Sequence, residues 1–334
     1  MSIGDHRSGT IPLEYGVPQG SVLGPLLFII YTTPLTELIQ RHSVLHEMYA
    51  DDTQMISSRK PEEFSILNAS LNNCVREIGA WMRENKLKLN EDKTEAVLFS
   101  YKLPSNADAI AELPVSMHMN DVNIQFSDSA LDLGFTIDKD LDMKQHILRV
   151  RKLAYAQIRQ ISSIRPFLTE EATKKLVCAC ILSRLDYCNA LLVGLPDSTI
   201  SMLQLVQNDA ARLVVRVRRN HHATEILKKL HWLPIKQRIK FKICCILYNI
   251  YAGDAPPYLN DRVARYEPER VLRSATEHKF SKAPRYNRED HGGRTLPVLA
   301  DKYWNKLPSA LRLSPSLQTF KTRLKTHLFD EAFS

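Results

Sequence analysis

Two short apolar-rich stretches flank the tetrapeptide Tyr49-Ala50-Asp51-Asp52, and this arrangement constrains the fold more than any other feature of the chain. Residues 45–50 and 53–57 are predicted to be strands that meet at a tight turn, which places both carboxylates at one exposed point. Carboxylate oxygens are the ligands that hard divalent cations prefer. A solvated acidic pair in a hairpin turn is also common, so the motif alone is compatible with both interpretations.

A glycine-rich segment, Gly16-Val17-Pro18-Gln19-Gly20-Ser21, lies upstream of this turn. Its two glycines allow positive φ or a close backbone approach, and Pro18 fixes the chain between them. Ser21 is a candidate N-cap for an apolar helix predicted at residues 22–38. A loop that leads into a helix N-terminus can lie against a nucleotide or a nucleic-acid backbone. An ordinary loop-to-helix turn is the alternative.

The first 140 residues predict an α+β fold. Apolar residues recur at three- and four-residue spacing over residues 61–85, which indicates an amphipathic helix. Strands are expected at 95–100 and 131–137, and a hairpin at 115–119 and 122–126, across Asn120-Asp121. These strands would form a small antiparallel-rich sheet that carries helices on one face.

From residue 143 onward the pattern is mostly helical. Helices are predicted around residues 147–158, after the N-cap Thr169, at 200–214 and at 235–251, and two more near 296–305 and 317–329. Residues 260–294 are predicted to be loop with short helices at best. We therefore expect three parts: residues 1–140, residues 141–255 and residues 256–334.

The charge is divided between the two halves of the chain. Residues 1–140 contain 11 Lys and Arg against 20 Asp and Glu, whereas residues 141–334 contain 34 against 17. A basic half attracts nucleic-acid phosphates through counterion release, and an acidic half suits bound metal ions.

Three basic clusters stand out in the second half. The first holds Arg212, Arg216, Arg218 and Arg219, followed by His221-His222, and the second holds Lys236, Arg238, Lys240 and Lys242. The third runs from Lys279 to Arg294 and combines six basic residues, among them Lys279, Lys282, Arg285 and Arg288, with Tyr286 and Gly292-Gly293. The third cluster is the best candidate for nucleic-acid contact, because an aromatic side chain can stack on an exposed base. Solvated helix faces or a solvated linker are the alternatives.

The cysteines and the hydropathy favour an intracellular protein, in the nucleus or the cytoplasm. The six cysteines show no CxxC spacing and no matched histidine pair, so buried reduced thiols are a better interpretation than a zinc site. No apolar run approaches the roughly 18 residues of a membrane helix, and we expect no membrane association.

Taken together, the motifs resemble those of a known family. The glycine-rich segment, Tyr49-Ala50-Asp51-Asp52, residues 87–95 and residues 131–137 resemble, in order, four palm motifs of reverse transcriptases from LINE-type, non-LTR retrotransposons. Residues 183–190, 230–234 and 303–308 resemble the thumb and C-terminal region of the same elements. The expected fold is accordingly a partial polymerase palm followed by a helical thumb.

The resemblance implies roles for individual residues. Asp51 would be a catalytic metal ligand assisted by Asp52, with Mg²⁺ or Mn²⁺ as the metal, and Lys93 would approach the triphosphate of the incoming dNTP. The nucleotide and template would lie near Gly16, Pro18, Gln19, Gly20 and Tyr49. Leu133 and Gly134 would belong to the turn that grips the primer end. The implied partners are an RNA template and a DNA primer.

One departure from the family pattern bears on activity. In the family, the fingers and a first palm strand with its own metal-binding aspartate precede the glycine-rich loop, whereas fifteen residues precede Gly16 here. Because nucleotidyl transfer gains most from two metals, a chain with Asp51 and Asp52 alone is expected to bind metal weakly and to polymerise little. Three classes of function stay open: a polymerase, a non-catalytic nucleic-acid-binding protein, and a remnant without function.

Overall fold

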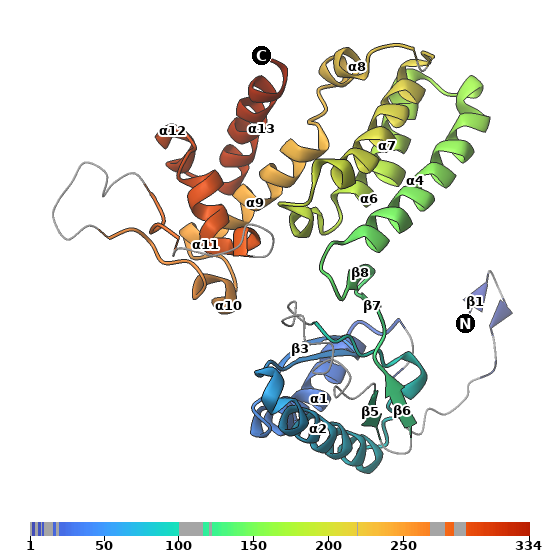
Figure 1. Ribbon diagram of the computed structural model, residues 1–334. Coiled ribbons are helices and arrows are strands. Elements are labelled where there is room, and N and C mark those ends of the chain that lie inside the picture. The colour runs from blue at the N-terminus through green and yellow to red at the C-terminus, as the bar shows by residue number, and fades with distance from the viewer. Residues whose placement is uncertain are drawn as a thin grey trace. The chain divides into compact units, whose positions relative to one another are not determined.

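The computed structural model describes most of the 334-residue chain, and the chain forms two compact units, Met1–Ala130 and Leu131–Ser334. The described residues are 2–3, 6–7, 9, 16–17, 20–99, 116–119, 122–218, 220–267, 278–283 and 292–334. Figure 1 shows strands and two long helices in the first unit and mainly helices in the second. This is the expected α+β fold, while the division into three parts stays a prediction.

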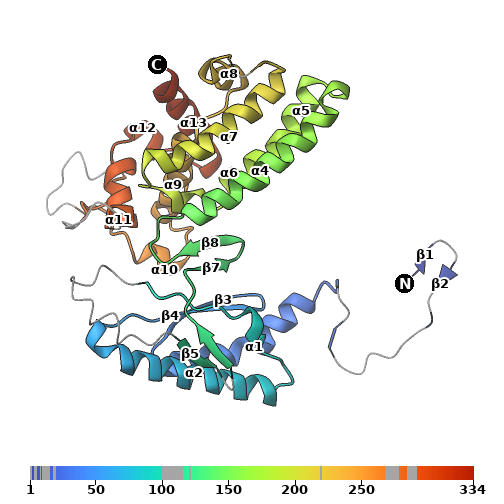
Figure 2. The ribbon, with the colours of Figure 1, turned by 45° about the vertical axis from the view of Figure 1, so that its right-hand side comes forward.

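The first unit is built on two helices that cover one face of a hairpin. Its elements are β1 (Ser2–Ile3), β2 (His6–Arg7), α1 (Gly24–Arg41), β3 (Leu45–Tyr49), β4 (Asp52–Ile56), α2 (Phe64–Glu84), β5 (Ser116–Met119) and β6 (Val122–Gln125), with 3-10 turns at Pro61–Glu63 and Glu91–Lys93. Leu35 and Ile39 of α1 pack with Ile78 of α2, and Met48 and Met55 of the β3–β4 hairpin lie against this cluster. The helices α1 and α2 lie beside each other in Figures 1 and 2.

The strands of the first unit form separate two-stranded sheets rather than the single sheet that we expected. The hairpins β3–β4 and β5–β6 are antiparallel, at the predicted positions within one residue at each end. The strand predicted at 95–100 is wrong for the described residues: only Ala96 forms a bridge, to Phe126. Because β6 ends at Gln125, it does not extend far enough to pair with more of this segment.

The second unit is a helical assembly with one hairpin at its start. Its elements are β7 (Ser129–Asp132), which crosses the boundary between the units, β8 (Phe135–Asp138), α4 (Lys144–Ile164), α5 (Glu170–Val177), a π-helical turn (Cys178–Leu182), α6 (Ser183–Asp186), α7 (Asp197–Val215), α8 (Ala223–Leu230), α9 (Ile235–Ala252), α10 (Pro257–Asn260), α11 (Leu296–Leu299), a second π-helical turn (Ala300–Trp304), α12 (Ser309–Arg312) and α13 (Leu317–Phe333). Helix α4 packs beside α7 and α9 beside α13 (Figure 2). One large apolar core, which includes Ile147, Leu203 and Trp304, joins these helices.

Most of the predicted long helices are confirmed. The Thr169 hydroxyl accepts a hydrogen bond from the Ala172 amide at 3.1 Å, as expected of an N-cap. Ser21 is not a cap, because α1 begins at Gly24 with Pro25 in its first turn. Short helices α8 and α12 were not predicted. None of the described helices combines the length and the apolar character that a membrane crossing requires.

The strand predicted at 131–137 is instead the hairpin β7–β8, which turns at Leu133 and Gly134. Their φ angles are 45° and 85°. Two successive positive φ values give the turn that suits the right-handed twist of paired strands. The alternating apolar residues of this segment imitate one strand, and only Gly134 marks the turn.

Candidate functional site

The two predicted catalytic aspartates lie at the tip of the β3–β4 hairpin. Tyr49 stands opposite Asp52 at the end of the ladder, and Ala50 and Asp51 form the two-residue turn. Ala50 has a φ of 54°, which turns the chain within two residues. Asp51, Asp52 and Tyr49 are all exposed. The hairpin therefore presents two carboxylates and a phenol ring to solvent at one point.

This donor set suits one hard cation better than two. Among the described residues, no group of three or more His, Cys, Asp or Glu side chains is placed to hold a metal ion. Mg²⁺ is commonly held by one or two carboxylates together with substrate phosphates and waters. Asp51 and Asp52 can supply those carboxylates, whereas a two-metal arrangement requires a further bridging ligand.

The other residues assigned to the catalytic and nucleotide sites are placed as follows. Lys93 ends the 3-10 turn Glu91–Lys93, is exposed, and forms no ion pair with Asp51 or Asp52. Gly16 and Gly20 have φ angles of 79° and 85°, so both use the conformational freedom that we expected of them. Pro18 and Gln19 lie outside the described residues.

In the second unit, the turn of the β7–β8 hairpin is held at the N-terminal end of α4. His146 of α4 is buried; its Nδ1 accepts a hydrogen bond from the Thr136 amide at 3.3 Å, and its ring stacks on Phe135 at 3.9 Å between centroids. The Tyr187 hydroxyl donates to the Leu133 carbonyl at the turn itself. The predicted primer-grip residues Leu133 and Gly134 thus belong to a well-supported turn.

Helix α4 carries a basic stripe that sequence reasoning did not single out. Its 21 residues include five Lys and Arg and no Asp or Glu. Arg149, Lys152 and Arg159 are exposed, and their spacing places them along one side of the helix. Within the described part of the chain, none of the three is paired with a carboxylate. The absence of acidic residues over 21 positions is the signal that could have identified this stripe.

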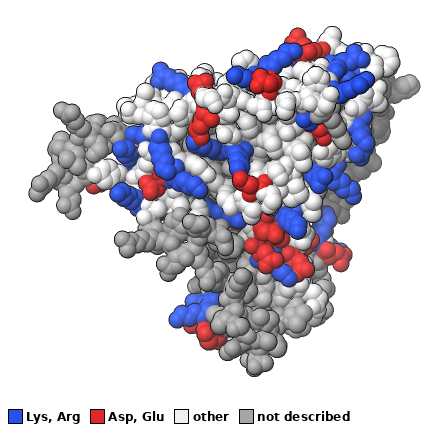
Figure 3. All heavy atoms as spheres, turned by 45° about the horizontal axis from the view of Figure 1, so that its top comes forward, with Lys and Arg blue, Asp and Glu red and all other residues white. Residues whose placement is uncertain are grey.

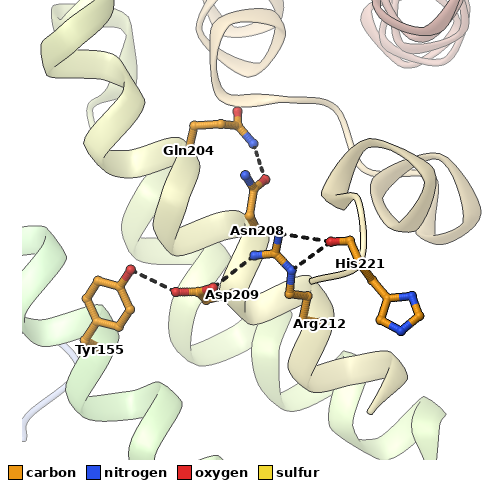
Figure 4. Close-up of polar contacts among 6 residues, drawn as sticks. All are labelled: Tyr155, Gln204, Asn208, Asp209, Arg212 and His221. Carbon is orange, nitrogen blue, oxygen red and sulfur yellow. Dashed lines mark hydrogen bonds and ion pairs between the residues drawn. The ribbon is translucent and has the colours of Figure 1, made fainter. Parts of the chain in front are cut away.

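Arg212, from the first predicted basic cluster, has a structural position. Its guanidinium pairs with Asp209 at 3.1 Å and donates twice to the His221 carbonyl, and Asp209 in turn accepts from the Tyr155 hydroxyl (Figure 4). Gln204 donates to Asn208 in the same close-up. Arg212 therefore ties the loop after α7 to the helix, with its charge largely compensated.

The remaining members of that cluster and of the third one differ in exposure. Arg216 and Arg218 are exposed in the loop after α7. Lys282 is exposed and Lys279 is half-buried. A hydrogen bond from the Tyr266 amide to the Lys279 carbonyl, at 3.0 Å, holds this segment in place. Four predicted nucleic-acid-binding residues lie outside the described residues: Arg219, Arg285, Tyr286 and Arg288.

The basic cluster on α9 is largely neutralised. Lys236 pairs with Asp197 at 2.8 Å, Arg238 forms two bonds with Asp186, and Lys240 pairs with Glu331. These partners come from distant segments of the chain, so the pairs join α9 to its neighbours. The local spacing of the lysines and arginines could not have revealed this.

Of the six free cysteines, Cys74, Cys244 and Cys245 are buried as expected, whereas Cys178, Cys180 and Cys188 are half-buried. Burial raises the pKa of the Cys74 and Cys245 thiols to about 11 and that of Cys244 to about 12. Since the thiolate is the reactive form, these three side chains are poor nucleophiles at neutral pH. They act as small apolar groups in the core.

Comparison with protein families finds a match for the first part of the chain. Residues 2–137 match the family described as reverse transcriptase (RNA-dependent DNA polymerase), which includes the aspartate hairpin and β8 up to Ile137. These residues are similar to that family, whose members are as a class metal-dependent and act on nucleic acids.

The relatives are encoded by mobile elements of Drosophila melanogaster. The chain is 28% identical over 170 residues to the RNA-directed DNA polymerase from mobile element jockey, which aligns with 48% of this chain and 17% of that protein. It is 26% identical over 244 residues to the probable RNA-directed DNA polymerase from transposon BS, with 70% of this chain and 26% of that protein aligned. The resemblance to LINE-type reverse transcriptases is thus confirmed.

A third relative and the solved structures complete the comparison. The probable RNA-directed DNA polymerase from transposon X-element is 26% identical over 205 residues, with 60% of this chain and 21% of that protein aligned. The chain therefore spans between about a sixth and a quarter of the length of these relatives. No solved structure matches it significantly.

Proposed function

We propose that this chain holds an RNA template paired with a DNA primer, through the basic side of α4 in its second unit. One observation carries the proposal: α4 has five cations and no acidic residue, and Arg149, Lys152 and Arg159 are exposed along one side of it. Unpaired cations at helical spacing can follow a phosphate backbone, and the release of condensed counterions then favours binding.

The ends of α4 extend this surface. At its N-terminal end the β7–β8 turn is fixed by the contact between His146 and Thr136. At its C-terminal end, Arg165 donates to the carbonyls of Leu213 and Val214, so the loop with Arg216 and Arg218 begins close to where α4 finishes. Lys and Arg are widely spread over the face drawn in Figure 3, and the acidic side chains are fewer.

Catalysis by this chain alone is proposed to be weak. Asp51 and Asp52 would hold one Mg²⁺ or Mn²⁺ ion together with the phosphates of a dNTP, and the ion would supply charge stabilisation for nucleotidyl transfer. Lys93, exposed on its 3-10 turn, would offset charge on the triphosphate. Because the described residues provide no third carboxylate at this point, activation of the attacking oxygen by a second metal is not supported.

Primer extension on a primed RNA template separates the two parts of this proposal. We compare the intact chain with Asp51→Asn and measure both extension and binding of the hybrid, in Mg²⁺ and in Mn²⁺. We expect equal binding by both proteins and little extension by either. Extension that Asp51→Asn abolishes would show that catalysis is efficient and that a further metal ligand exists. Loss of binding by both proteins would leave the inert-remnant interpretation.

A further inference from the structure

The segment Ser183–Asn189 is a prominent motif of the second unit, and the proposed function so far leaves it without a role. Its Asp186 ends α6 and accepts a hydrogen bond from Arg238 Nε at 2.7 Å and a second one from Nη2 of the same side chain. Asn189, which is buried, donates to the same carboxylate at 3.3 Å. A bidentate arginine contact fixes both distance and orientation. The segment is therefore anchored to α9.

The next residue, Tyr187, reaches from this anchor to the β7–β8 turn. Its backbone leaves α6 in an extended conformation, and its hydroxyl donates to the Leu133 carbonyl, 54 residues earlier in the chain. The ring also covers Gly134, since a Cβ built there would lie 3.9 Å from Tyr187 Cε1. Tyr187 is 48% exposed, so one side of the ring faces solvent.

The turn that Tyr187 contacts has two residues with positive φ, of which only Gly134 is a residue type that favours this conformation. Gly134 adopts a φ of 85° without a side-chain clash, whereas Leu133 has a φ of 45°, in the left-handed region that L-residues with a side chain rarely adopt. Such a conformation persists when surrounding contacts determine it. The hydrogen bond to the Leu133 carbonyl is a contact of this kind, and it comes from a rigidly anchored segment.

We propose that Tyr187 is a positioning residue that holds the Leu133–Gly134 turn in place for contact with the bound nucleic acid. The inference rests on the proposed function, because the turn needs a fixed position only if it contacts the bound nucleic acid. Asp186 fixes the segment to α9, Tyr187 transmits that position to the turn, and the turn stands at the N-terminal end of the basic helix α4. Tyr187 itself acts through the backbone of Leu133.

The test uses the full chain and the variant Tyr187→Phe, which removes the hydroxyl and keeps the ring. We expect hybrid binding to weaken by up to roughly fivefold and the unfolding midpoint to fall slightly, because one ordinary hydrogen bond that holds the turn is lost. The control is Tyr248→Phe, because the Tyr248 hydroxyl also donates to a backbone carbonyl, that of Ser314, at 2.9 Å in the core. That variant should lower the unfolding midpoint and leave hybrid binding unchanged.

Two further measurements keep the proposal falsifiable. Gly134→Ala strains the same turn, so its effect on binding should not add to that of Tyr187→Phe in the double variant. Amide exchange at Gly134 and Phe135 should accelerate in Tyr187→Phe even without nucleic acid. If the wild-type chain fails to bind the hybrid, the proposed function falls, and unchanged amide exchange would separately overturn the role of Tyr187. Wild-type affinity in Tyr187→Phe would overturn it as well.

Discussion

At the scale of single residues, Arg165 shows how a buried cation is accommodated without a carboxylate. It is 6% exposed, and its guanidinium donates to the carbonyls of Leu213, Leu168 and Val214 at 3.0, 2.7 and 2.8 Å. Two of these carbonyls belong to the last turn of α7, where the helix dipole is negative. The charge and the geometry of Arg165 thus cap α7 and join it to the end of α4.

Replacing Arg165 with lysine keeps the charge and removes the planar fork of donors. We expect the free energy of unfolding to fall by about 2–3 kcal/mol, because at least one buried carbonyl then lacks its charged donor. Urea unfolding measures this. Arg159→Lys, on the exposed side of α4, is the matched control and should change stability by less than about 0.5 kcal/mol. Equal effects of the two substitutions would contradict the capping role of Arg165.

His146 gives the second unit a defined sensitivity to acid. Burial, together with the nearby charge of Arg149, lowers the pKa of the imidazole to about 4 from its ordinary value of 6.5. Between these values the unfolded chain binds a proton that the folded chain does not. Stability is therefore full above pH 6.5 and falls as the pH drops toward 4, by about 3 kcal/mol in total for this group.

The difference between wild type and His146→Gln isolates this contribution from that of the carboxylates, since those titrate in both proteins. We expect urea midpoints of the wild type to fall more steeply than those of the variant between pH 6.5 and 4. His222→Gln, at an exposed position, should behave as the wild type does. Parallel pH profiles for wild type and His146→Gln would show that the imidazole is not buried in its neutral form.

At the scale of elements, the first turns of α1 leave a large apolar surface exposed. Residues Val22, Leu23, Leu26, Leu27, Ile29, Ile30 and Tyr31 are between 48% and 93% exposed. A helix that is apolar on all sides is normally covered, and exposed patches of this kind promote association. The C-terminal half of α1, by contrast, buries Leu35, Leu38 and Ile39.

We expect the chain to self-associate through this part of α1. The double variant Leu26→Lys, Ile30→Lys should lower the average mass measured by sedimentation velocity and leave the unfolding midpoint nearly unchanged. Leu35→Lys, at a position 1% exposed, should instead unfold the first unit. A wild-type chain that stays monomeric at micromolar concentration would contradict the prediction.

The elements that could be predicted are those whose signal is local. Helices α2, α4, α7 and α9 follow from apolar periodicity, and the β3–β4 hairpin follows from its two apolar stretches around a turn. The predictions of a single sheet and of a strand at 95–100 are wrong because strand pairing depends on partners that lie far apart in the chain. Apolar alternation predicted one strand at 131–137 because Leu133 adopts a positive φ that its residue type disfavours, and only the family resemblance implied a turn at Leu133 and Gly134.

At the scale of the whole molecule, the chain separates an acidic, carboxylate-presenting unit from a basic helical unit. This division could be predicted from charge counts alone. The sequence could not show which Lys and Arg side chains are available to bind phosphates, because ion pairing depends on the tertiary structure. Arg238 and Lys240 are neutralised by Asp186 and Glu331, which come from distant segments. Tyr187 had no local signal either, since its partner lies 54 residues away.

The central claim is that α4 follows the phosphates of the hybrid, and the salt dependence of binding tests it most directly. We would measure hybrid affinity against salt concentration for the wild type and for the triple variant Arg149→Gln, Lys152→Gln, Arg159→Gln. The control triple variant carries Lys302→Gln, Arg323→Gln and Lys325→Gln, three exposed cations near the C-terminus. The account predicts that the slope of log affinity against log salt becomes shallower by about 2 to 3 in the α4 variant and changes much less in the control. Equal slopes for the two variants would contradict it.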